Sequence, residues 1–243
     1  MTPWADMAEA LLVGALAAST LLIGAVVAVV VQPSARVKAI VMALGAGILI
    51  GSVSYELVDE ALVSLPLWQV SLMLFVGSAT FLLGARWIEH AGGGRRKHPR
   101  GHDENTQGQA IVLGSILDGI PESVVLGLTV LQGSVSLPLF VGVALSNLPE
   151  GVASTSGLRA SGWSVKRIVG MWSAVIAASA ISCALGYLLL EADGGGVAQA
   201  FAAGALLTMV ADTMLPDSYA VEKTWTGGLV VTGFALAVAL GAL

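Results

Sequence analysis

The chain has 243 residues, of which 56% are hydrophobic and only 11% are charged, and its mean hydropathy is +0.87. A soluble domain carries about 25% charged residues, so a chain this apolar needs a lipid bilayer to cover much of its surface. The formal net charge of −5 gives no indication of nucleic-acid binding, and the single cysteine, Cys183, excludes an intramolecular disulfide and a cysteine-rich metal site.

Eight apolar segments predict membrane-spanning helices, because a helix of about 20 apolar residues crosses the hydrocarbon core. We therefore expect an all-α integral membrane protein with one transmembrane domain over residues 1–243. Residues 89–108 are rich in glycine and basic residues, which predicts a flexible polar loop. The predicted spans are residues 9–31, 38–60, 67–88, 109–131, 137–159, 165–190, 197–217 and 226–243.

The basic residues predict the orientation of the chain, because cytoplasmic loops carry an excess of lysine and arginine. With eight spans, every lysine and arginine falls on one side of the membrane. We therefore expect the 89–108 loop in the cytoplasm, both termini on the extracytoplasmic side, and the chain in the plasma (inner) membrane. The basic residues are Arg36, Lys38, Arg86, Arg95, Arg96, Lys97, Arg100, Arg159, Lys166, Arg167 and Lys223.

Two pairs of predicted helices resemble each other. The fourth and fifth helices carry LDGIPES from Leu117 and LSNLPEG from Leu145, and by the predicted topology they are antiparallel. The second and seventh helices are also antiparallel and share a pattern of small and apolar residues. Inverted repeats of this kind are typical of secondary transporters with a binding site at the membrane midplane. In the second pair, Ala43, Ala46, Gly47, Leu49 and Val53 match Ala200, Ala203, Gly204, Leu206 and Val210.

Acidic residues inside the predicted spans indicate an ion pathway. Asp118 and Glu122 fall near the middle of the fourth helix and Glu150 near the middle of the fifth, while Glu56 and Asp212 lie nearer the membrane faces. A carboxylate at the bilayer centre costs several kcal/mol unless it is paired, protonated or solvated. The sequence places no basic residue at those depths, which leaves a bound cation, a shared proton or a water-filled path.

The spacing of these residues places oxygen atoms on one face of each helix. Asp118 and Glu122 are four residues apart, as are Ser146 and Glu150, and Asn147 lies three residues before Glu150. If the two faces meet, they supply three carboxylates, an amide and a hydroxyl. Oxygen ligands suit Mg²⁺, Ca²⁺ and Mn²⁺, and carboxylates also bind Zn²⁺.

Prolines lie beside both acidic stripes. Pro121 and Pro149 lack a backbone N–H and so free the carbonyl groups of Leu117 and Leu145, four residues earlier. A freed carbonyl in a membrane helix is satisfied locally or lines a polar cavity. We therefore expect these two carbonyls near the acidic stripes, where they could add ligands for a cation.

At these residues the sequence resembles the ZIP (Zrt-/Irt-like) family of metal transporters, in which the fourth and fifth helices each carry a His-Asn-x-Pro-Glu-Gly type motif. Residues 118–123 read DGIPES and residues 146–151 read SNLPEG. The stretches ELVDEA from Glu56 and DTMLPDSY from Asp212 are also similar to the family. The resemblance covers nearly the whole chain and implies eight helices in a 3+2+3 arrangement, with a metal site on the fourth and fifth.

The chain departs from the family motif at three positions. Asp118 and Ser146 stand where the family often has histidine, and Gly119 stands where it has asparagine. The site is therefore poor in nitrogen ligands, and we expect weaker discrimination of Zn²⁺ from Mn²⁺, Fe²⁺ or Cd²⁺. Whether the site holds one metal or two stays open.

All three histidines, His90, His98 and His102, lie in or beside the 89–108 loop, where ZIP proteins often carry a histidine-containing loop. Imidazole binds Zn²⁺ well, so a loop metal site is one interpretation and a solvated basic loop is the other. Gly47 and Gly51 form a GxxxG pair, which is compatible with a homodimer but does not establish one.

We expect a transporter that moves a divalent cation into the cytoplasm, with Zn²⁺ as the first candidate, no cofactor and no enzymatic activity. Three alternatives stay open. The same carboxylates could relay protons in a carrier of another small solute, Asp118 and Asp212 could form an intramembrane protease dyad, or a metal-binding relative could have lost transport. The expected path passes Glu56 and Asp59 at the outer mouth, then Asp118, Glu122, Ser146, Asn147 and Glu150, then Asp212.

Overall fold

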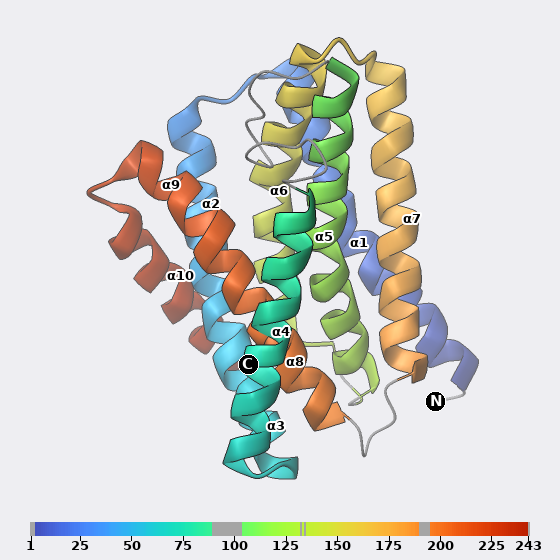
Figure 1. Ribbon diagram of the computed structural model, residues 1–243, viewed down its shortest axis with the longest axis vertical. Helices are drawn as coiled ribbons and strands as arrows, with labels where there is room; N and C mark the ends of the chain where they lie inside the picture. The colour runs from blue at the N-terminus through green and yellow to red at the C-terminus, as the bar shows by residue number, and fades with distance from the viewer. Residues whose placement is uncertain (1–2, 89–103, 132, 134, 190–194, 243) are drawn as a thin grey trace.

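The computed structural model describes residues 3–88, 104–131, 133, 135–189 and 195–242 (Figure 1). All regular structure in these residues is helical, as the sequence predicts. Short π-helical segments, η1 and η3, interrupt two of the long helices. In chain order the elements are α1 (Pro3–Val30), α2 (Ala35–Ser52), η1 (Val53–Val58), α3 (Asp59–Ser64), α4 (Leu67–Ile88), α5 (Glu104–Leu131), α6 (Leu137–Ala160), α7 (Val165–Leu189), α8 (Gly195–Met209), η3 (Val210–Met214), α9 (Leu215–Glu222) and α10 (Thr226–Gly241).

Seven of the helical spans in the described residues are long and apolar enough to cross a membrane. Two of them are composite, because α2, η1 and α3 run together over Ala35–Ser64, and α8, η3 and α9 over Gly195–Glu222. The eighth, α10, is apolar but has only 16 residues. The prediction of an all-helical protein is therefore confirmed for the described residues, and the lengths and compositions of the helices are compatible with a multi-pass membrane protein.

The predicted helix boundaries agree best with the observed ones where a turn residue interrupts the apolar pattern. The third predicted span, residues 67–88, coincides with α4, which follows Pro66. The first helix begins at Pro3, earlier than the predicted residue 9. The seventh helical span continues through η3 and α9 to Glu222, beyond the predicted end at residue 217. Helix α5 begins at Glu104 and so takes up the last residues of the predicted loop; residues 89–103 of that loop lie outside the described residues.

The helices pack in a pattern that places α5 and α6 in the interior. Helix α1 packs along α6 and α7, α5 packs along α7, and α6 also packs against α2. On the other side of α6, α2 packs along α10 and α4 packs along α8. Figure 1 shows α5 running from the upper to the lower end of the bundle and α6 returning in the opposite direction. The two helices that carry the Pro-Glu motifs are therefore antiparallel neighbours.

The sequence match between the second and seventh predicted helices extends to their structure. Val53 and Val210, which are matched residues, begin η1 and η3. Each π segment packs against the other helix, η1 against α8 and η3 against α2. A π segment inserts one residue into a helical turn and rotates the side chains that follow, which often happens at functional sites. Every matched residue in the two helices is buried.

Two glycines in this matched set allow close approach of backbones. A side chain at Gly47 would collide with the carbonyl oxygen of Val230 in α10, and one at Gly204 with that of Leu74 in α4. Gly51 also faces α10, where its Cβ would lie 2.7 Å from Ala237 Cβ. The GxxxG pair of α2 is therefore used for packing within the chain.

Candidate functional site

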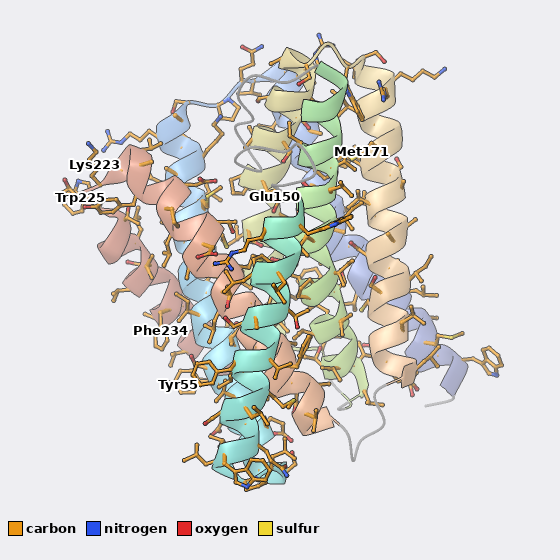
Figure 2. The ribbon with its side chains drawn as sticks, viewed as in Figure 1. Tyr55, Glu150, Met171, Lys223, Trp225 and Phe234 are labelled. Atoms are coloured by element: carbon orange, nitrogen blue, oxygen red, sulfur yellow. The ribbon has the colours of Figure 1, made fainter. Side chains whose placement is uncertain are left out.

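A continuous strip of buried polar side chains lies between α5 and α6, and we call it the polar ladder. Its members are only 3–8% exposed, although they lie in spans that are otherwise apolar. Figure 2 shows one of them, Glu150, among the helices, whereas Lys223 and Trp225 lie at the periphery. The polar ladder consists of Ser115, Asp118 and Glu122 of α5 and Ser146, Glu150 and Ser154 of α6.

Two direct contacts set the register of the ladder. The Ser146 hydroxyl donates a hydrogen bond of 3.1 Å to Glu122 Oε1, and the hydroxyl oxygens of Ser115 and Ser154 lie 3.4 Å apart. Asp118 lies one turn before Glu122 on α5, and Glu150 lies one turn after Ser146 on the antiparallel α6. The residues Asp118 and Glu150 are therefore at the same level along the two helices, between the Ser146–Glu122 contact and the Ser115–Ser154 contact.

The structure buries all five residues that the sequence predicts as metal ligands, and it joins Ser146 to Glu122 directly, while Asp118 and Glu150 lie one turn away on the same two helices. The Nδ2 of the fifth, Asn147, donates a hydrogen bond of 3.3 Å to the carbonyl oxygen of Ala17 in α1. Because only the NH₂ group can donate to a carbonyl, the amide nitrogen faces α1. Asn147 thus connects α1 to the site.

Three serines near the site were not predicted from the sequence. Ser115 and Ser154 extend the acidic stripes by one turn, and their spacing from Asp118 and Glu150 could have indicated them. Ser179 of α7 is buried, and a Cβ at Gly119 would lie 3.9 Å from its hydroxyl oxygen. No local pattern marks Ser179, because only the packing of α7 on α5 places it there.

Both helices remain α-helical through their internal prolines, Pro121 and Pro149. The carbonyl group of Leu145, which Pro149 deprives of its helical partner, faces α2. A Cβ at Gly45 of α2 would lie 3.4 Å from this oxygen. The close approach of α2 therefore covers one side of the carbonyl that the sequence suggested as an additional ligand.

The three acidic residues predicted along the pathway lie outside the ladder. Glu56 lies in η1 and is partly buried; its carboxyl interacts with the Ser136 hydroxyl at the start of α6, and its Oε2 has no hydrogen-bond partner among the described residues. Asp59 is exposed at the start of α3, and Asp212 is exposed in η3. These three carboxylates therefore belong to the two matched helical spans, Ala35–Ser64 and Gly195–Glu222, and not to α5 or α6.

Asp212 lines a cavity of about 730 Å³ that reaches the helix of Glu150. Pro149 and Ala153 of α6 form one wall, while α2, α4, η3 and α9 form the others. The charged residues of this cavity have both signs, with Lys38 and Arg86 opposite in charge to Asp212 and Asp217. The cavity extends from Pro149, the residue before Glu150, to the end of the bundle that carries Lys38, and none of the six ladder residues lines it.

Among the described residues, no group of three or more histidine, cysteine, aspartate and glutamate side chains is close enough together to hold a metal ion. A cation held by the ladder would therefore use serine oxygens together with carboxylates. His90, His98 and His102, and with them the predicted loop site, lie outside the described residues.

No family model matches the chain, and no curated protein sequence matches it.

Proposed function

We propose that the chain is a ZIP-type transporter that moves a divalent metal cation across the plasma (inner) membrane into the cytoplasm. The proposal depends chiefly on one observation: three buried carboxylates and three buried hydroxyls lie along the facing sides of α5 and α6, and two contacts join these sides inside helices long and apolar enough to cross a membrane. Zn²⁺ is the first candidate substrate, and Cd²⁺, Mn²⁺ and Fe²⁺ are the others.

The physical argument concerns the charge of the ladder. Transferring a carboxylate from water into a membrane interior costs several kcal/mol, and residues that bear this cost usually mark ion pathways. A divalent cation bound between Asp118 and Glu150 would offset two negative charges at once. The hydroxyls of Ser115, Ser146 and Ser154 lie within the same strip and are hard oxygen ligands.

The proposed route uses both sets of acidic residues. The cation passes Glu56 and Asp59, binds in the polar ladder, and leaves through the cavity beside Asp212. Figure 1 places the α1–α2 and α6–α7 connections at the same end of the bundle, and basic residues lie in the helix ends beside both connections. This supports an orientation with that end in the cytoplasm and both termini outside.

The proposed architecture is the 3+2+3 arrangement with inverted repeats. It is supported by the two matched π segments, η1 and η3, and by the antiparallel Pro-Glu motifs of α5 and α6. In such transporters one group of helices moves against another around a midplane site. We assign the chain no catalytic residues and no cofactor.

Metal uptake into proteoliposomes tests the proposal. The wild type should take up at least one of Zn²⁺, Cd²⁺, Mn²⁺ and Fe²⁺ with saturable kinetics, and a Glu122→Gln plus Glu150→Gln variant should not. Glu9→Gln plus Glu60→Gln is the matched control, because it removes the same charge from α1 and α3, outside the ladder. A folded wild type that transports none of the four metals would refute the proposed function.

A carrier that uses the same carboxylates to relay protons is the alternative, and protection of the carboxylates distinguishes the two. A hydrophobic carbodiimide modifies buried carboxyl groups, and mass spectrometry locates the modified residues. A transported metal should slow modification of Asp118, Glu122 and Glu150 but not of Asp59. If solute uptake follows a pH gradient and added metal gives no protection, the ladder serves protons.

A further inference from the structure

A cavity of about 370 Å³ lies between the end of α1, the start of α2 and the second half of α6. Figure 1 places these parts of the three helices at the end of the bundle where α1 connects to α2 and α6 to α7. Lys38 lines both this cavity and the one beside Asp212. The described residues around the smaller cavity are Ala28, Val29, Gln32, Pro33, Lys38, Val152, Ser156 and Arg159.

The charged residues that line this cavity are all positive. Lys38 and Arg159 are basic, and none of the described lining residues is acidic. Arg159 Nη1 donates a hydrogen bond of 3.1 Å to the carbonyl oxygen of Trp163, which ties the guanidinium to the α6–α7 turn and leaves other N–H donors of its fork. The cavity beside Asp212 differs, since it contains carboxylates as well as cations.

Gln32 adds an uncharged amide to the same lining. Its backbone has φ of 51°, in the left-handed region, where glycine or asparagine usually ends a helix. Its N–H donates to the carbonyl oxygen of Val27 at 3.0 Å, so the turn closes α1 at this point. A long polar side chain is therefore held at the edge of the cavity by a conformation that glycine would adopt more easily.

Apart from Ser156, whose hydroxyl donates a hydrogen bond to the carbonyl oxygen of Val152, the remaining lining is apolar and continues onto an exposed face of α1. Val29 is 41% exposed, and Val26, one turn earlier on α1, is 53% exposed. An anion at the basic residues would therefore have an exposed aliphatic face directly beside it, at the depth where the apolar part of α1 ends.

We propose that this cavity binds the phosphate headgroup of an anionic phospholipid, with its acyl chains along the exposed face of α1. The basic residues and the Gln32 amide match the headgroup, and the valines match the chains. Basic pockets between membrane helices on the cytoplasmic side are suited to anionic headgroups. A free phosphate would use the same cations but would gain nothing from the apolar side.

Native mass spectrometry of the detergent-solubilised protein tests the proposal with defined lipids. The wild type should bind dioleoylphosphatidylglycerol about tenfold more tightly than dioleoylphosphatidylcholine, which has the same chains but no net charge. Lys38→Gln plus Arg159→Gln should remove most of this preference. Lys166→Gln plus Lys223→Gln removes the same charge from residues that do not line the cavity and should keep it.

A second variant keeps the test decisive if the charge variant fails to fold. Ser156→Leu fills the cavity but retains both basic residues, and it should also lower phosphatidylglycerol binding. Equal binding of the two lipids by the wild type, or an equal loss in the control pair, would overturn the proposal. If inorganic phosphate displaced bound phosphatidylglycerol as effectively as added phosphatidylglycerol does, the cavity would be assigned to a free anion instead.

Discussion

The α5–α6 pair and the α2–α8 pair have much in common, and they differ in where their polar groups lie. Both pairs are antiparallel, both carry matched sequences, and both contain many small residues. The α5–α6 pair buries carboxylates between its helices, whereas the matched residues of α2 and α8 are alanine, glycine, leucine and valine. The acidic residues of the second pair lie in or after its π segments, and Asp59 and Asp212 are exposed.

This difference separates two uses of small residues in membrane helices. In α2 and α8, Gly47 and Gly204 let neighbouring backbones touch, which strengthens van der Waals contact where lipid provides no hydrophobic driving force. In α5 and α6, Gly127 and Gly151 allow the same close approach to α7 and α1, and serines add hydroxyl oxygens to a buried acidic strip. The first pair therefore holds helices together, and the second also buries the negative charge that the proposed cation site requires.

Single carboxyl-to-amide changes should show the largest contrast between the two pairs. Asp118→Asn should lower the initial rate of metal uptake by about 10- to 100-fold, the range seen when even a partner of a metal ligand is lost. Asp212→Asn should lower it only about twofold, because an exposed charge acts through water. Proteoliposome uptake over a range of metal concentrations measures both.

Equal losses in the Asp118 and Asp212 variants would show that the two helix pairs contribute equally to the pathway. Circular dichroism and size-exclusion chromatography of each variant would provide the control for folding, since both substitutions preserve side-chain size.

The glycine contacts of the α2–α8 pair should dominate stability. Gly204→Ala places a methyl group against the carbonyl oxygen of Leu74, a backbone atom that cannot rotate away, and should reduce the free energy of unfolding by about 1–3 kcal/mol. Gly228→Ala in α10 meets no atom within 4 Å and should be neutral or stabilise by about 0.5–1 kcal/mol. Unfolding in mixed detergent micelles measures both changes.

If Gly204→Ala proved as stable as Gly228→Ala, the close α4–α8 contact would not contribute to stability. Gly170→Ala in α7 is a second control, because a Cβ there also meets open space.

The contents of the α5–α6 strip could be predicted from the sequence because they follow local spacing. Asp118 and Glu122, like Ser146 and Glu150, are one helical turn apart, and the two prolines mark the same helices. The features that could not be predicted depend on contacts between distant segments. Examples are the bond from Asn147 to Ala17 and the approach of Gly45 to Leu145.

The π segments were also missed, for a different reason. Hydropathy reports that residues 38–60 and 197–217 are apolar, and an extra residue in one turn changes neither the composition nor the length of the span appreciably. The match of Val53 with Val210 was visible in the sequence, but its structural meaning was not. The irregular turns depend instead on contacts between distant segments, since η1 packs against α8 and η3 packs against α2.

The Ser146–Glu122 contact should affect metal binding more than the neighbouring serine pair does. A hydrogen bond to a charged group contributes about 1.5–3 kcal/mol, so Ser146→Ala should raise the KM for metal about tenfold or more. Ser154→Ala removes a longer contact between two neutral hydroxyls and should change KM by about threefold at most. A larger effect of Ser154→Ala would move the binding position toward Ser115.

The smallest effect is expected at the ends of the α2–α8 pair, where charges do meet. Arg36 Nε lies 2.7 Å from Glu222 Oε1, with the arginine side chain 68% and the glutamate side chain 7% exposed. The Ser218 hydroxyl also donates to the carbonyl oxygen of Ala39 at 2.9 Å, so two contacts join the start of α2 to α9. Because water screens Arg36, Arg36→Ala should cost only about 0.5–1 kcal/mol of unfolding free energy, and less at high salt.

Ser218→Ala is the variant with which Arg36→Ala should be compared, because it removes the other contact between α2 and α9. Ser218 is fully buried, and losing its bond leaves the Ala39 carbonyl with one partner fewer, at a cost of about 1 kcal/mol that salt should not change. Unfolding at low and high salt separates the two contacts. If Arg36→Ala had the larger, salt-independent effect, the ion pair would be part of the buried core, and the α2–α8 pair would resemble α5–α6 in depending on buried charge.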